Sequence, residues 1–577
     1  MKKLFRYLKG YEKECVLAPL FKMLEASFEL LVPLVIAAII DTGIASGDRG
    51  YIVRMCLVLV ALGVVGLATS ITAQYFAAKA AVGFAARIRH GLLERLQSLS
   101  YSDMDRLGTS TMITRMTSDV NQVQNGVNLA LRLLLRSPFV VFGAMIMAFT
   151  IDWKAAMTFA AVIPVLCLVV FGIMLWTIPQ YKAVQERLDQ VTGAARENLS
   201  GVRVIRAFCM EDRETRAFNG RNDRLTSLQE KVGRVSALLN PVTYVIINLA
   251  VIALIWVGGL RVSSGILTQG QVVALYNYMS QILVELIKMA NLIITMTKAA
   301  ACGNRIQSVL DMTPAQKNGT AVPGPDAPRG QVEFRDVSLQ YPGSGAESLT
   351  GLRFTAKPGQ TVGIIGGTGS GKTSLVNLIP RFYDATAGQV LVDGVDVKDF
   401  DMADLRRRVA VAPQKAVLFR GTIRSNLLFG NPNATGEDLA EALRIAQAAE
   451  IVAGKAGGLD EPIEQGGANL SGGQRQRLTI ARALACKPEI LILDDSASAL
   501  DYATDSHLRG AIRAMKNGPT TFIVSQRAAS VRFADQIIVL EDGKVADIGT
   551  HEELLDRCQT YQEIYYSQFP KEAASNG

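Results

Sequence analysis

The chain has 577 residues, of which 49% are hydrophobic and 19% charged, and its formal net charge is +8. The apolar residues are unevenly spread, because long uncharged runs stop near residue 300 and a soluble α/β pattern follows. This distribution excludes a single soluble domain and predicts a membrane part followed by a soluble part. The modest positive charge indicates cytosolic loops beside anionic lipid and argues against nucleic acid as a partner.

Six segments have the roughly 20 mostly apolar residues that a membrane-spanning helix needs. We predict these spans over residues 15–40, 53–78, 128–150, 154–179, 236–260 and 271–297. The basic N-terminus could begin a signal peptide, but the apolar stretch after it is too long for one and carries Lys22, Glu25 and Glu29. The sequence therefore predicts a retained first span.

Lysine and arginine in the short loops predict how the spans are oriented. The loops at 41–52, 151–153 and 261–270 are poor in both residues, whereas 84–124 and 181–235 are long and rich in arginine. We therefore expect a multi-pass plasma-membrane protein with both termini and the soluble part in the cytoplasm. Arg132 and Arg136, in the first turns of the third span, are expected to reach the cytosolic interface.

The two long inner segments are themselves helical in pattern, with apolar residues at helical spacing over 84–99 and 184–218. The spanning helices are therefore expected to continue into the cytosol, with a short turn at the end of each pair. We expect the turns at 110–119 and 199–208 to contact the soluble domain.

Polar side chains stand within the spans, where polarity is costly. Glu25 and Glu29 share one face of the first span, with Lys22 alongside. The sixth span carries a stripe of Gln281, Glu285, Lys288 and Thr295. Ionisable groups in a bilayer usually face a cavity or a partner, so two interpretations stay open. One is pairing of charges, such as Glu285 with Lys288. The other is a wet translocation pathway touching Glu25, Glu29, Gln281, Glu285 and Lys288.

Residues 312–330 are rich in proline and glycine and predict a linker. It would join a six-span α-helical membrane domain over 1–311 to a soluble α/β domain over 331–567, with a C-terminal tail at 568–577. Alternating apolar and polar residues from Gln331 predict the first strand of the soluble domain.

A glycine-rich loop lies between an apolar strand and a helix in the segment TVGIIGGTGSGKTSLVNLI. Residues 366–373 fit the G-x-x-x-x-G-K-[ST] pattern, in which backbone N–H groups and a helix N-terminus surround phosphates. Lys372 would neutralise phosphate charge, and the Thr373 hydroxyl would hold Mg²⁺. The expected ATP-binding residues here are Gly366, Gly367, Thr368, Gly369, Ser370, Gly371, Lys372, Thr373 and Ser374.

Two more motifs follow this loop. The strand EILILDD ends at Asp494 and Asp495, and a carboxylate at such a strand end can hold Mg²⁺. Before it, LSGGQ opens a helix and predicts a second anion-binding helix end. One ATP does not need two such ends in the same domain, so the second is expected to serve another nucleotide across a dimer interface. Its residues are Ser471, Gly472, Gly473 and Gln474.

LSGGQ about 20 residues before that strand resembles the signature of ABC transporter ATPases. With six preceding spans, the whole chain resembles a half-transporter of the ABC exporter family of the multidrug and lipid type. The resemblance implies ATP and Mg²⁺ as cofactors and a second half-transporter as partner. Each ATP would lie between the glycine loop and EILILDD strand (the Walker motifs) of one half and the LSGGQ of the other.

The same resemblance implies roles for single residues. Tyr341 would stack on adenine, and Gln414 would touch Mg²⁺ together with Thr373 and Asp494. Residues 498–501, ending in Asp501, would form the D-loop. The stretches at 110–119 and 201–208 would be the coupling helices of the membrane domain.

Two candidate catalytic residues depart from the family pattern. The family places Glu after the Walker B Asp as the base that polarises water, and this chain has Asp495. Its carboxylate is pulled back by roughly 1.5 Å, on the scale of a C–C bond, and a misplacement of about 1 Å can cost around a hundredfold. The family has His where this chain has Gln526, which can donate a hydrogen bond but cannot carry a positive charge.

These departures resemble the degenerate-site subunit of heterodimeric bacterial exporters. The chain's own Walker motifs would hydrolyse weakly, while its intact LSGGQ would complete a competent site with a partner carrying Glu and His. A homodimer with two slow sites and an ATP-gated regulatory or pore subunit are the alternatives. The six spans disfavour a soluble P-loop enzyme, and their fusion to the ATP-binding domain disfavours an importer. The expected cargo is a small amphipathic molecule such as a drug, lipid or peptide.

Overall fold

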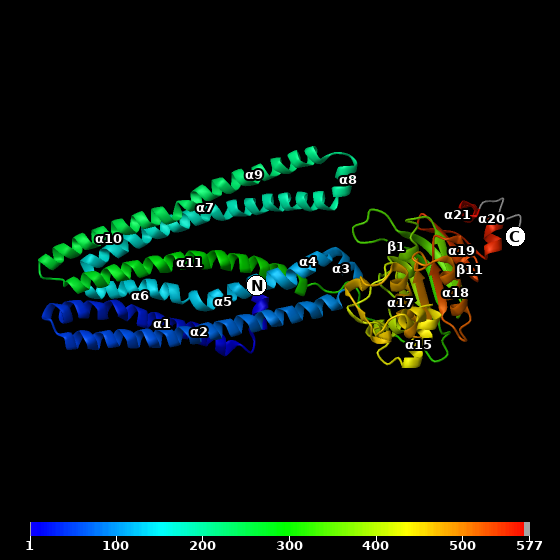
Figure 1. Cartoon of the computed structure of the whole chain (residues 1–577), viewed down its shortest axis with the longest axis horizontal. Coiled ribbons are helices and arrows are strands. Elements are labelled where there is room, and N and C mark those ends of the chain that lie inside the picture. Colours follow the sequence, from blue (N-terminus) through cyan, green and yellow to red (C-terminus); the bar gives the residue numbers. More distant parts are fainter. Residues whose placement is uncertain (1, 570–577) are drawn as a thin grey trace. The chain divides into compact units, whose positions relative to one another are not determined.

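The computed structural model describes residues 2–569, which form two compact units (Figure 1). The membrane unit comprises Met1–Gln97 and Ser110–Met312, and the P-loop unit comprises Ser98–Thr109 and Thr313–Gly577. Most of the expected C-terminal tail, residues 570–577, lies outside the described residues.

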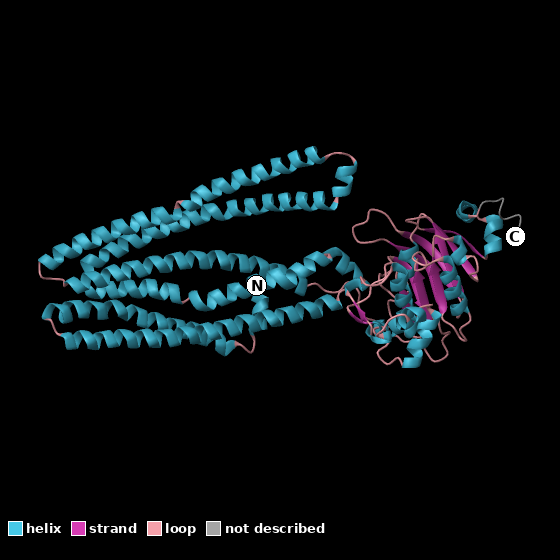
Figure 2. Cartoon of the chain, viewed as in Figure 1, coloured by secondary structure: helices cyan, strands magenta, loops and turns pink. Residues whose placement is uncertain are grey.

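The described residues of the membrane unit are helical apart from short turns (Figure 2). Its elements are η1 (Lys2–Leu8), α1 (Glu12–Ala38), η2 (Ile39–Ile44), α2 (Arg49–Ser98), α4 (Thr109–Thr114), η3 (Arg115–Asp119), α5 (Val120–Leu133), α6 (Arg136–Ile151), α7 (Trp153–Ser200), α8 (Val202–Ala207), α9 (Glu211–Ala237), α10 (Leu239–Ser263) and α11 (Gln269–Leu310).

Within residues 2–569, six helical stretches are long and apolar enough to cross a membrane. They are Glu12–Ile44, Arg49–Ser98, Thr109–Ile151, Trp153–Ser200, Glu211–Ser263 and Gln269–Leu310. Each predicted span lies inside one of them, so the prediction of six spans is confirmed. The structure lengthens the helices well beyond the predicted spans.

The length of these helices follows from uninterrupted helix-forming sequence on both sides of the apolar windows. α2 has 50 residues, which at 1.5 Å each makes about 75 Å, against a hydrocarbon core of about 30 Å. Alanines at 77, 80, 81 and 85 are buried along its inner half, where small residues allow close helix packing. α7 and α9 run side by side as a hairpin closed by α8 (Figure 1).

The P-loop unit contains one short helix from the first inner segment, α3 (Tyr101–Leu107), and the whole soluble domain. Its strands are β1 (Val332–Leu339), β2 (Leu349–Ala356), β3 (Thr361–Gly366), β4 (Ala387–Val392), β5 (Val395–Asp396), β6 (Val409–Ala412), β7 (Gly421–Thr422), β8 (Pro462–Ile463), β9 (Ile490–Asp494), β10 (Thr520–Val524), β11 (Gln536–Glu541) and β12 (Lys544–Gly549). Its other helices are α12 (Lys372–Leu378), α13 (Met402–Arg408), α14 (Ile423–Leu428), α15 (Gly436–Ile445), α16 (Ala449–Ala453), η4 (Gly458–Asp460), η5 (Gln465–Gly467), α17 (Gly472–Ala485), α18 (Tyr502–Arg513), α19 (Ala528–Val531), α20 (His551–Arg557) and α21 (Gln559–Gln568).

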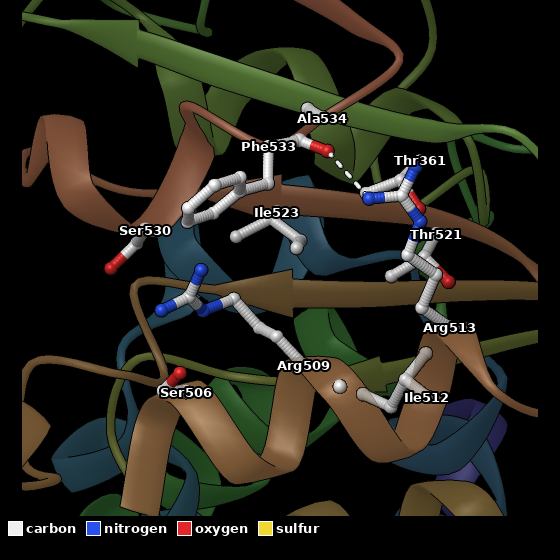
Figure 3. A pocket seen from close by; sticks show the side chains of 11 residues that line it. Thr361, Ser506, Arg509, Ile512, Arg513, Thr521, Ile523, Ser530, Phe533 and Ala534 are labelled. Atoms are coloured by element: carbon white, nitrogen blue, oxygen red, sulfur yellow. Dashed lines mark hydrogen bonds between the residues drawn. The ribbon is translucent and has the colours of Figure 1, made fainter. Parts of the chain in front are cut away.

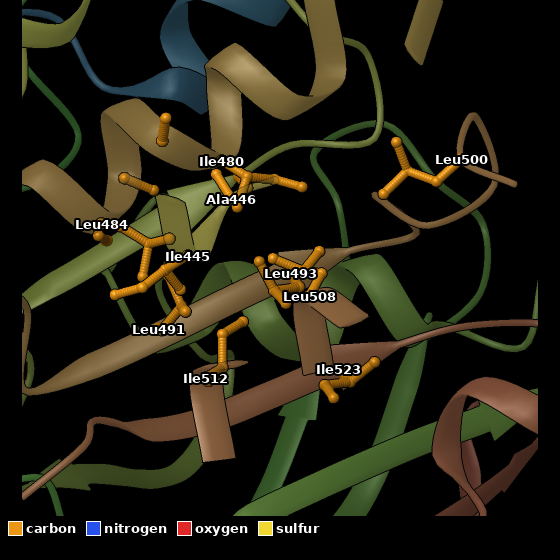
Figure 4. Close-up of a cluster of buried hydrophobic side chains, with 14 of the residues drawn as sticks. Ile445, Ala446, Ile480, Leu484, Leu491, Leu493, Leu500, Leu508, Ile512 and Ile523 are labelled. Carbon is orange, nitrogen blue, oxygen red and sulfur yellow. The ribbon is translucent and has the colours of Figure 1, made fainter. Parts of the chain in front are cut away.

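The central sheet has the order β12-β11-β3-β10-β9-β6, and all its pairs are parallel except β11 with β12. Alternation along β9 sends Leu491 and Leu493 to one face, where they pack with α15, α17 and α18 (Figure 4). Ile490 and Ile492 enter a second core on the opposite face. An antiparallel sheet of order β2-β1-β4-β5 contributes to that second core. The predicted α/β fold of the soluble part is confirmed.

α3 corrects the expected position of the first turn. The Ser100 side chain accepts from Asp103 N–H and begins a new helix after α2 ends, and Gly108, with φ +73°, ends it. Residues 110–119 instead continue the third span as α4 and η3, inside the membrane unit. The short helix that groups with the P-loop unit is therefore Tyr101–Leu107, whereas 110–119 belongs to the membrane unit. The capping box at Ser100 was the sequence signal for the true position.

Candidate functional site

The glycine loop between β3 and α12 curls around the ammonium of Lys372. Its Nζ donates to the carbonyl oxygens of Gly366 at 2.9 Å and Gly367 at 2.6 Å. A Cβ on Gly366 would overlap the Leu540 carbonyl, and Gly371 adopts φ +95°, so both positions require glycine. The loop therefore holds a buried cation at the N-terminus of α12, where an anion is favoured.

This loop forms one wall of a pocket of about 720 Å³ at the carboxyl ends of β3, β9 and β10. Ligands of open α/β sheets bind at this edge. The predicted residues that line it are Thr368, Gly369, Gly371, Lys372, Thr373, Ser374, Gln414, Asp494, Asp495 and Gln526. Lining residues that carried no motif are Ser344, Gly345, Ala346, Glu347, Ser348, Val524, Asp542 and Gly543.

Two hydrogen bonds connect the acidic end of β9 to neighbouring polar groups. Thr373 Oγ1 donates to Asp494 Oδ1 at 3.0 Å, and Gln414 Nε2 donates to Asp495 Oδ2 at 3.2 Å. Burial raises the pKa of Asp494 and of Asp495, and burial lowers the pKa of Lys372. The pocket thus partly shields the two carboxylates and the Lys372 ammonium from water. A bound triphosphate would compensate the charge of Lys372, and a divalent cation would compensate the carboxylates.

Tyr341 lies beside this pocket, not among the described residues of its wall. Its hydroxyl donates to Ser374 Oγ at 2.9 Å, in the first turn of α12. Its ring meets Tyr383 edge-on at 5.0 Å between centroids. The Tyr383 hydroxyl donates to Asp105 of α3 at 2.6 Å. A chain of contacts therefore links the glycine-loop helix to the short helix between the second and third spans.

The LSGGQ segment begins α17 as predicted. Ser471 Oγ accepts from Gln474 N at 3.3 Å, and Ser471 N donates to Gln474 Oε1 at 3.0 Å. Ser471 and Gly472 are exposed, and a Cβ on Gly472 would meet no atom within 4 Å. Among the described residues, none of the LSGGQ segment lines the glycine-loop pocket. The two helix ends are thus separate sites on one chain.

The predicted D-loop (498–501) contributes no residue to the described pocket wall, whereas the segment after β10 contributes Gln526. Asp501 caps α18 by accepting from Thr504 N at 2.9 Å and from Thr504 Oγ1 at 2.8 Å. Gln526 is exposed, and its carbonyl accepts from Gln568 Nε2 at 2.8 Å. Sequence reasoning placed Gln568 in the tail and missed this contact, because only the fold brings α21 beside the segment that follows β10.

A second cavity of the P-loop unit, about 200 Å³, lies between α18 and the central sheet (Figure 3). Arg509 pairs with Asp505 at 3.1 Å, and Arg513 donates to the Phe533 carbonyl at 3.4 Å. No predicted motif residue lines this cavity. The arginines there serve the packing of α18.

The membrane unit holds a pocket of about 300 Å³ among α1, α6 and α11. Two of its lining carboxylates pair with Arg136 of α6: Nη1 with Glu285 Oε1 at 2.5 Å and Nη2 with Glu29 Oε2 at 2.6 Å. Lys288 Nζ donates to Glu285 Oε1 at 2.8 Å, and Ser137 Oγ donates to Glu285 Oε2 at 2.8 Å. The pocket wall includes Glu29, Asn277, Ser280, Gln281, Glu285 and Lys288.

Arg136 is a correction to the sequence analysis. It was expected to reach the cytosolic interface, but it is 6% exposed and lies between two carboxylates from other helices. The sequence could not show this, because Glu29 and Glu285 are 107 and 149 residues away. The predicted pairing of Glu285 with Lys288 is confirmed. Glu25 pairs with Lys22 at 2.5 Å and is not among the pocket residues.

Comparison with known proteins identifies both units. Residues 15–286 match the family model described as ABC transporter transmembrane region, and residues 349–498 match the model described as ABC transporter. An uncharacterized ABC transporter ATP-binding protein of Bacillus subtilis is 36% identical over 580 residues, covering 100% of both chains. An ATP-dependent lipid A-core flippase of Syntrophus aciditrophicus is 32% identical, covering 84% of this chain and 81% of its own.

A solved bacterial Atm1-family ABC exporter with ATP bound superposes with a TM-score of 0.80 at 23% identity, over 97% of this chain and 99% of that one. That likeness concerns the fold, which agrees in both units. The chain therefore belongs to the ABC transporter family, and its ATPase domain couples ATP hydrolysis to transport through the membrane unit.

Proposed function

We propose that this chain is one half of an ATP-driven exporter of a small amphipathic molecule across the plasma membrane. The observation that carries the proposal has two parts. One chain joins a charged membrane pocket to an ATPase domain. The described wall of the glycine-loop pocket contains no LSGGQ residue, so a second half would have to supply that motif. A lipid flippase among the relatives supports a lipid or lipid-like cargo. The arginine-rich inner segments support cytoplasmic placement of both termini and of the ATPase domain.

Exposed apolar side chains at the end of the α7–α9 hairpin support a second half-transporter. Leu199, Val204 and Phe208 are 76%, 61% and 70% exposed, and α8 buries none of its residues. These residues lie well beyond the apolar window of their span, so lipid does not cover them. The exposed LSGGQ helix end likewise has no ligand from residues 2–569 of its own chain. A second ATPase domain would cover both.

The proposed partner differs from this chain in its catalytic residues. Asp495 would be the base of this chain's own site, yet its short side chain is already engaged by Gln414, and its backbone is held at φ +44°. Gln526 adds no charge beside the site. We therefore propose a heterodimer in which this chain's Walker motifs mainly bind ATP and its LSGGQ serves the competent site.

The residues at the end of β9 fit a magnesium ion. Mg²⁺ prefers oxygen ligands in an octahedron at about 2.1 Å, which places neighbouring ligands about 3 Å apart. Thr373 Oγ1 and Asp494 Oδ1 are 3.0 Å apart, and Gln414, whose side chain carries an amide oxygen, lines the same pocket. When bound, the ion would neutralise phosphate charge. Lys372 and the loop amides would orient the phosphates, and Tyr341 would hold the adenine.

Export is tested with the purified transporter in vesicles that carry a fluorescent short-chain phospholipid in the outer leaflet. ATP added outside reaches outward-facing ATPase domains and should increase the lipid protected from dithionite, because the transporter moves lipid away from the ATPase side. Leaving out ATP is the control. ATP hydrolysis with no ATP-dependent redistribution of any lipid, drug or peptide tested would contradict the proposal and favour a regulatory ATPase.

The membrane carboxylates should affect transport according to their place in the pocket. Glu29→Gln and Glu285→Gln should weaken transport of cationic substrates about tenfold, because a charge-assisted hydrogen bond contributes roughly 1.5–3 kcal/mol. Glu25→Gln, outside the pocket wall, is the matched control for a membrane carboxylate. Transport is measured over a panel of cations at equal amounts of assembled protein. Wild-type behaviour of both pocket variants would mean that these charges only pair between helices.

Tyr383 should couple the ATP site to the membrane unit. Tyr383→Phe keeps the ring against Tyr341 but removes the hydrogen bond to Asp105. We expect unchanged ATP affinity but fewer molecules transported per ATP. Asp105→Asn should have the same effect, and the double variant should be no worse than either single one, because the two groups share one bond. Independent, additive losses would contradict this link.

A further inference from the structure

The N-terminal segment packs closely against the inner half of α2. Tyr7 lies against Gly91, where a Cβ atom would approach the Tyr7 hydroxyl to 2.8 Å, and Tyr11 lies against Gly83, where a Cβ atom would overlap the Tyr11 ring. Leu4 is 1% exposed and anchors the first turn. The two glycines therefore let the segment lie along α2 in a fixed position.

A pocket of about 700 Å³ opens between this segment and α2. Three permanent cations line it: Arg6, Lys9 and Arg87. Arg6 and Arg87 lie over aromatic rings, those of Tyr7 and Tyr11, at 5.0 Å each. Within residues 2–569, none of the three cations forms an ion pair, so their charge is available to a ligand.

Two carboxylates, Glu12 and Glu94, line the same pocket and offset two of the three positive charges, so the lining keeps a net charge of +1. Glu12 accepts a hydrogen bond from Gly10 N–H at 2.8 Å. Glu94 is exposed at the far end of the lining on α2. His90 also lines the pocket and can donate a hydrogen bond in its neutral form. The pocket thus presents converging donors to an anion.

The pocket lies next to the proposed cytoplasmic edge of the membrane. An ion pair of Glu14 with Lys79, at 2.8 Å, joins the inner ends of the first two spans. Arg87 follows Lys79 by eight residues, or about 12 Å along the helix. The headgroup layer is about 5–8 Å thick, and an arginine stem reaches back several ångströms more. The cations therefore reach the level of lipid phosphates.

An exposed apolar face leads from the pocket into the membrane. Glu12, Val16 and Leu20 follow one another at four-residue spacing on one face of α1. Val16 is 67% exposed and Leu20 57% exposed. In the most apolar 18-residue stretch of α2, only 6% of the residues are buried, so this helix also faces lipid. A ligand with an anionic head and apolar chains fits this order of surfaces.

We propose that this pocket binds the headgroup of an anionic phospholipid of the inner leaflet, with the phosphodiester held by Arg6, Lys9 and Arg87. Guanidinium groups bind phosphate oxygens in a bidentate manner, and each cation near an anionic lipid surface contributes about fivefold in binding. The acyl chains lie along Val16 and Leu20. The site is separate from the membrane pocket at Glu29 and Glu285. Of the proposed function, this inference requires only that the N-terminus lies on the cytoplasmic side of the membrane.

Native mass spectrometry of the full-length transporter in an equimolar mixture of phosphatidylglycerol and phosphatidylcholine tests the site. Wild-type protein should retain phosphatidylglycerol preferentially. The triple variant R6Q/K9Q/R87Q should lose about a hundredfold of that preference, since three cations contribute about fivefold each. The charge-preserving variant R6K/R87K should keep most of it. A triple variant with wild-type preference would overturn the proposal.

Two controls make the result specific. Arg213, Arg221 and Lys516 are exposed cations elsewhere on the chain, and replacing all three with Gln removes the same net charge without touching the pocket. That variant should retain phosphatidylglycerol like wild type, and an equal loss would mean a general charge effect. Millimolar inorganic phosphate should not displace the lipid; displacement would make this a soluble-anion site. ATP hydrolysis in the same preparations reports on the proposed function separately.

Discussion

Replacing Ser471 with arginine should nearly abolish steady-state ATP hydrolysis by the assembled transporter. Ser471 begins α17, and the exposed amides after it form an anion-binding helix end with no ligand from the described part of its own chain. In the proposed heterodimer this end holds the γ-phosphate at the competent site. An arginine side chain would displace those donors, and loss of one preorganised donor alone costs about a hundredfold to a thousandfold in rate.

A matched control distinguishes loss of the phosphate contact from loss of a helix cap. Thr435 caps α15 with the same reciprocal hydrogen bonds that Ser471 makes, and it is also exposed. Thr435→Arg should cost about 1 kcal/mol of stability, as cap losses do, and leave hydrolysis near wild type. If both variants lose hydrolysis equally, the effect of Ser471→Arg is structural.

Replacing Lys372 with alanine should remove most nucleotide from this chain's own Walker site. Lys372 is 8% exposed, and its ammonium is held by the loop carbonyls where phosphates would lie. Each charge-assisted hydrogen bond contributes roughly 1.5–3 kcal/mol, so affinity should fall about tenfold to a hundredfold or more. Photolabelling of this chain by an azido-ATP in the assembled transporter measures it.

Lys357→Ala, an exposed lysine on the same unit, is the control for this prediction and should label like wild type. Wild-type labelling of the Lys372→Ala variant would contradict the assignment of the glycine loop as the ATP site. Transport should also fall in that variant, because this site still has to bind ATP for the two ATPase domains to associate.

Local sequence patterns predicted the spans and the ATP motifs because each depends on neighbouring residues. The glycine loop needs only a strand before Gly366 and a helix after Gly371, and both are local. The six spans needed only runs of apolar residues. Ser471 capped a helix as expected because its partner, Gln474, is three residues away.

Contacts between distant segments could not be predicted in this way. Arg136 looked like an interfacial arginine until α1 and α11 placed Glu29 and Glu285 beside it. The position of α3 was missed, although Ser100 and Asp103 form a recognisable capping box. Asp542 and Gly543 belong to no phosphate-binding motif and line the pocket only because β11 lies next to β3.

The central claim is that the two ATP sites of the transporter are unequal, and Asp495→Asn tests it most directly. Asp495 lines this chain's pocket, but its side chain is one methylene shorter than the Glu that the family has at this position. Its carboxylate also accepts a hydrogen bond from Gln414. Steady-state hydrolysis by the purified transporter carrying Asp495→Asn should stay within about threefold of wild type, because a misplaced base contributes little to turnover. A loss as severe as that expected from Ser471→Arg would show that this site is catalytic and would favour a homodimer with two slow sites.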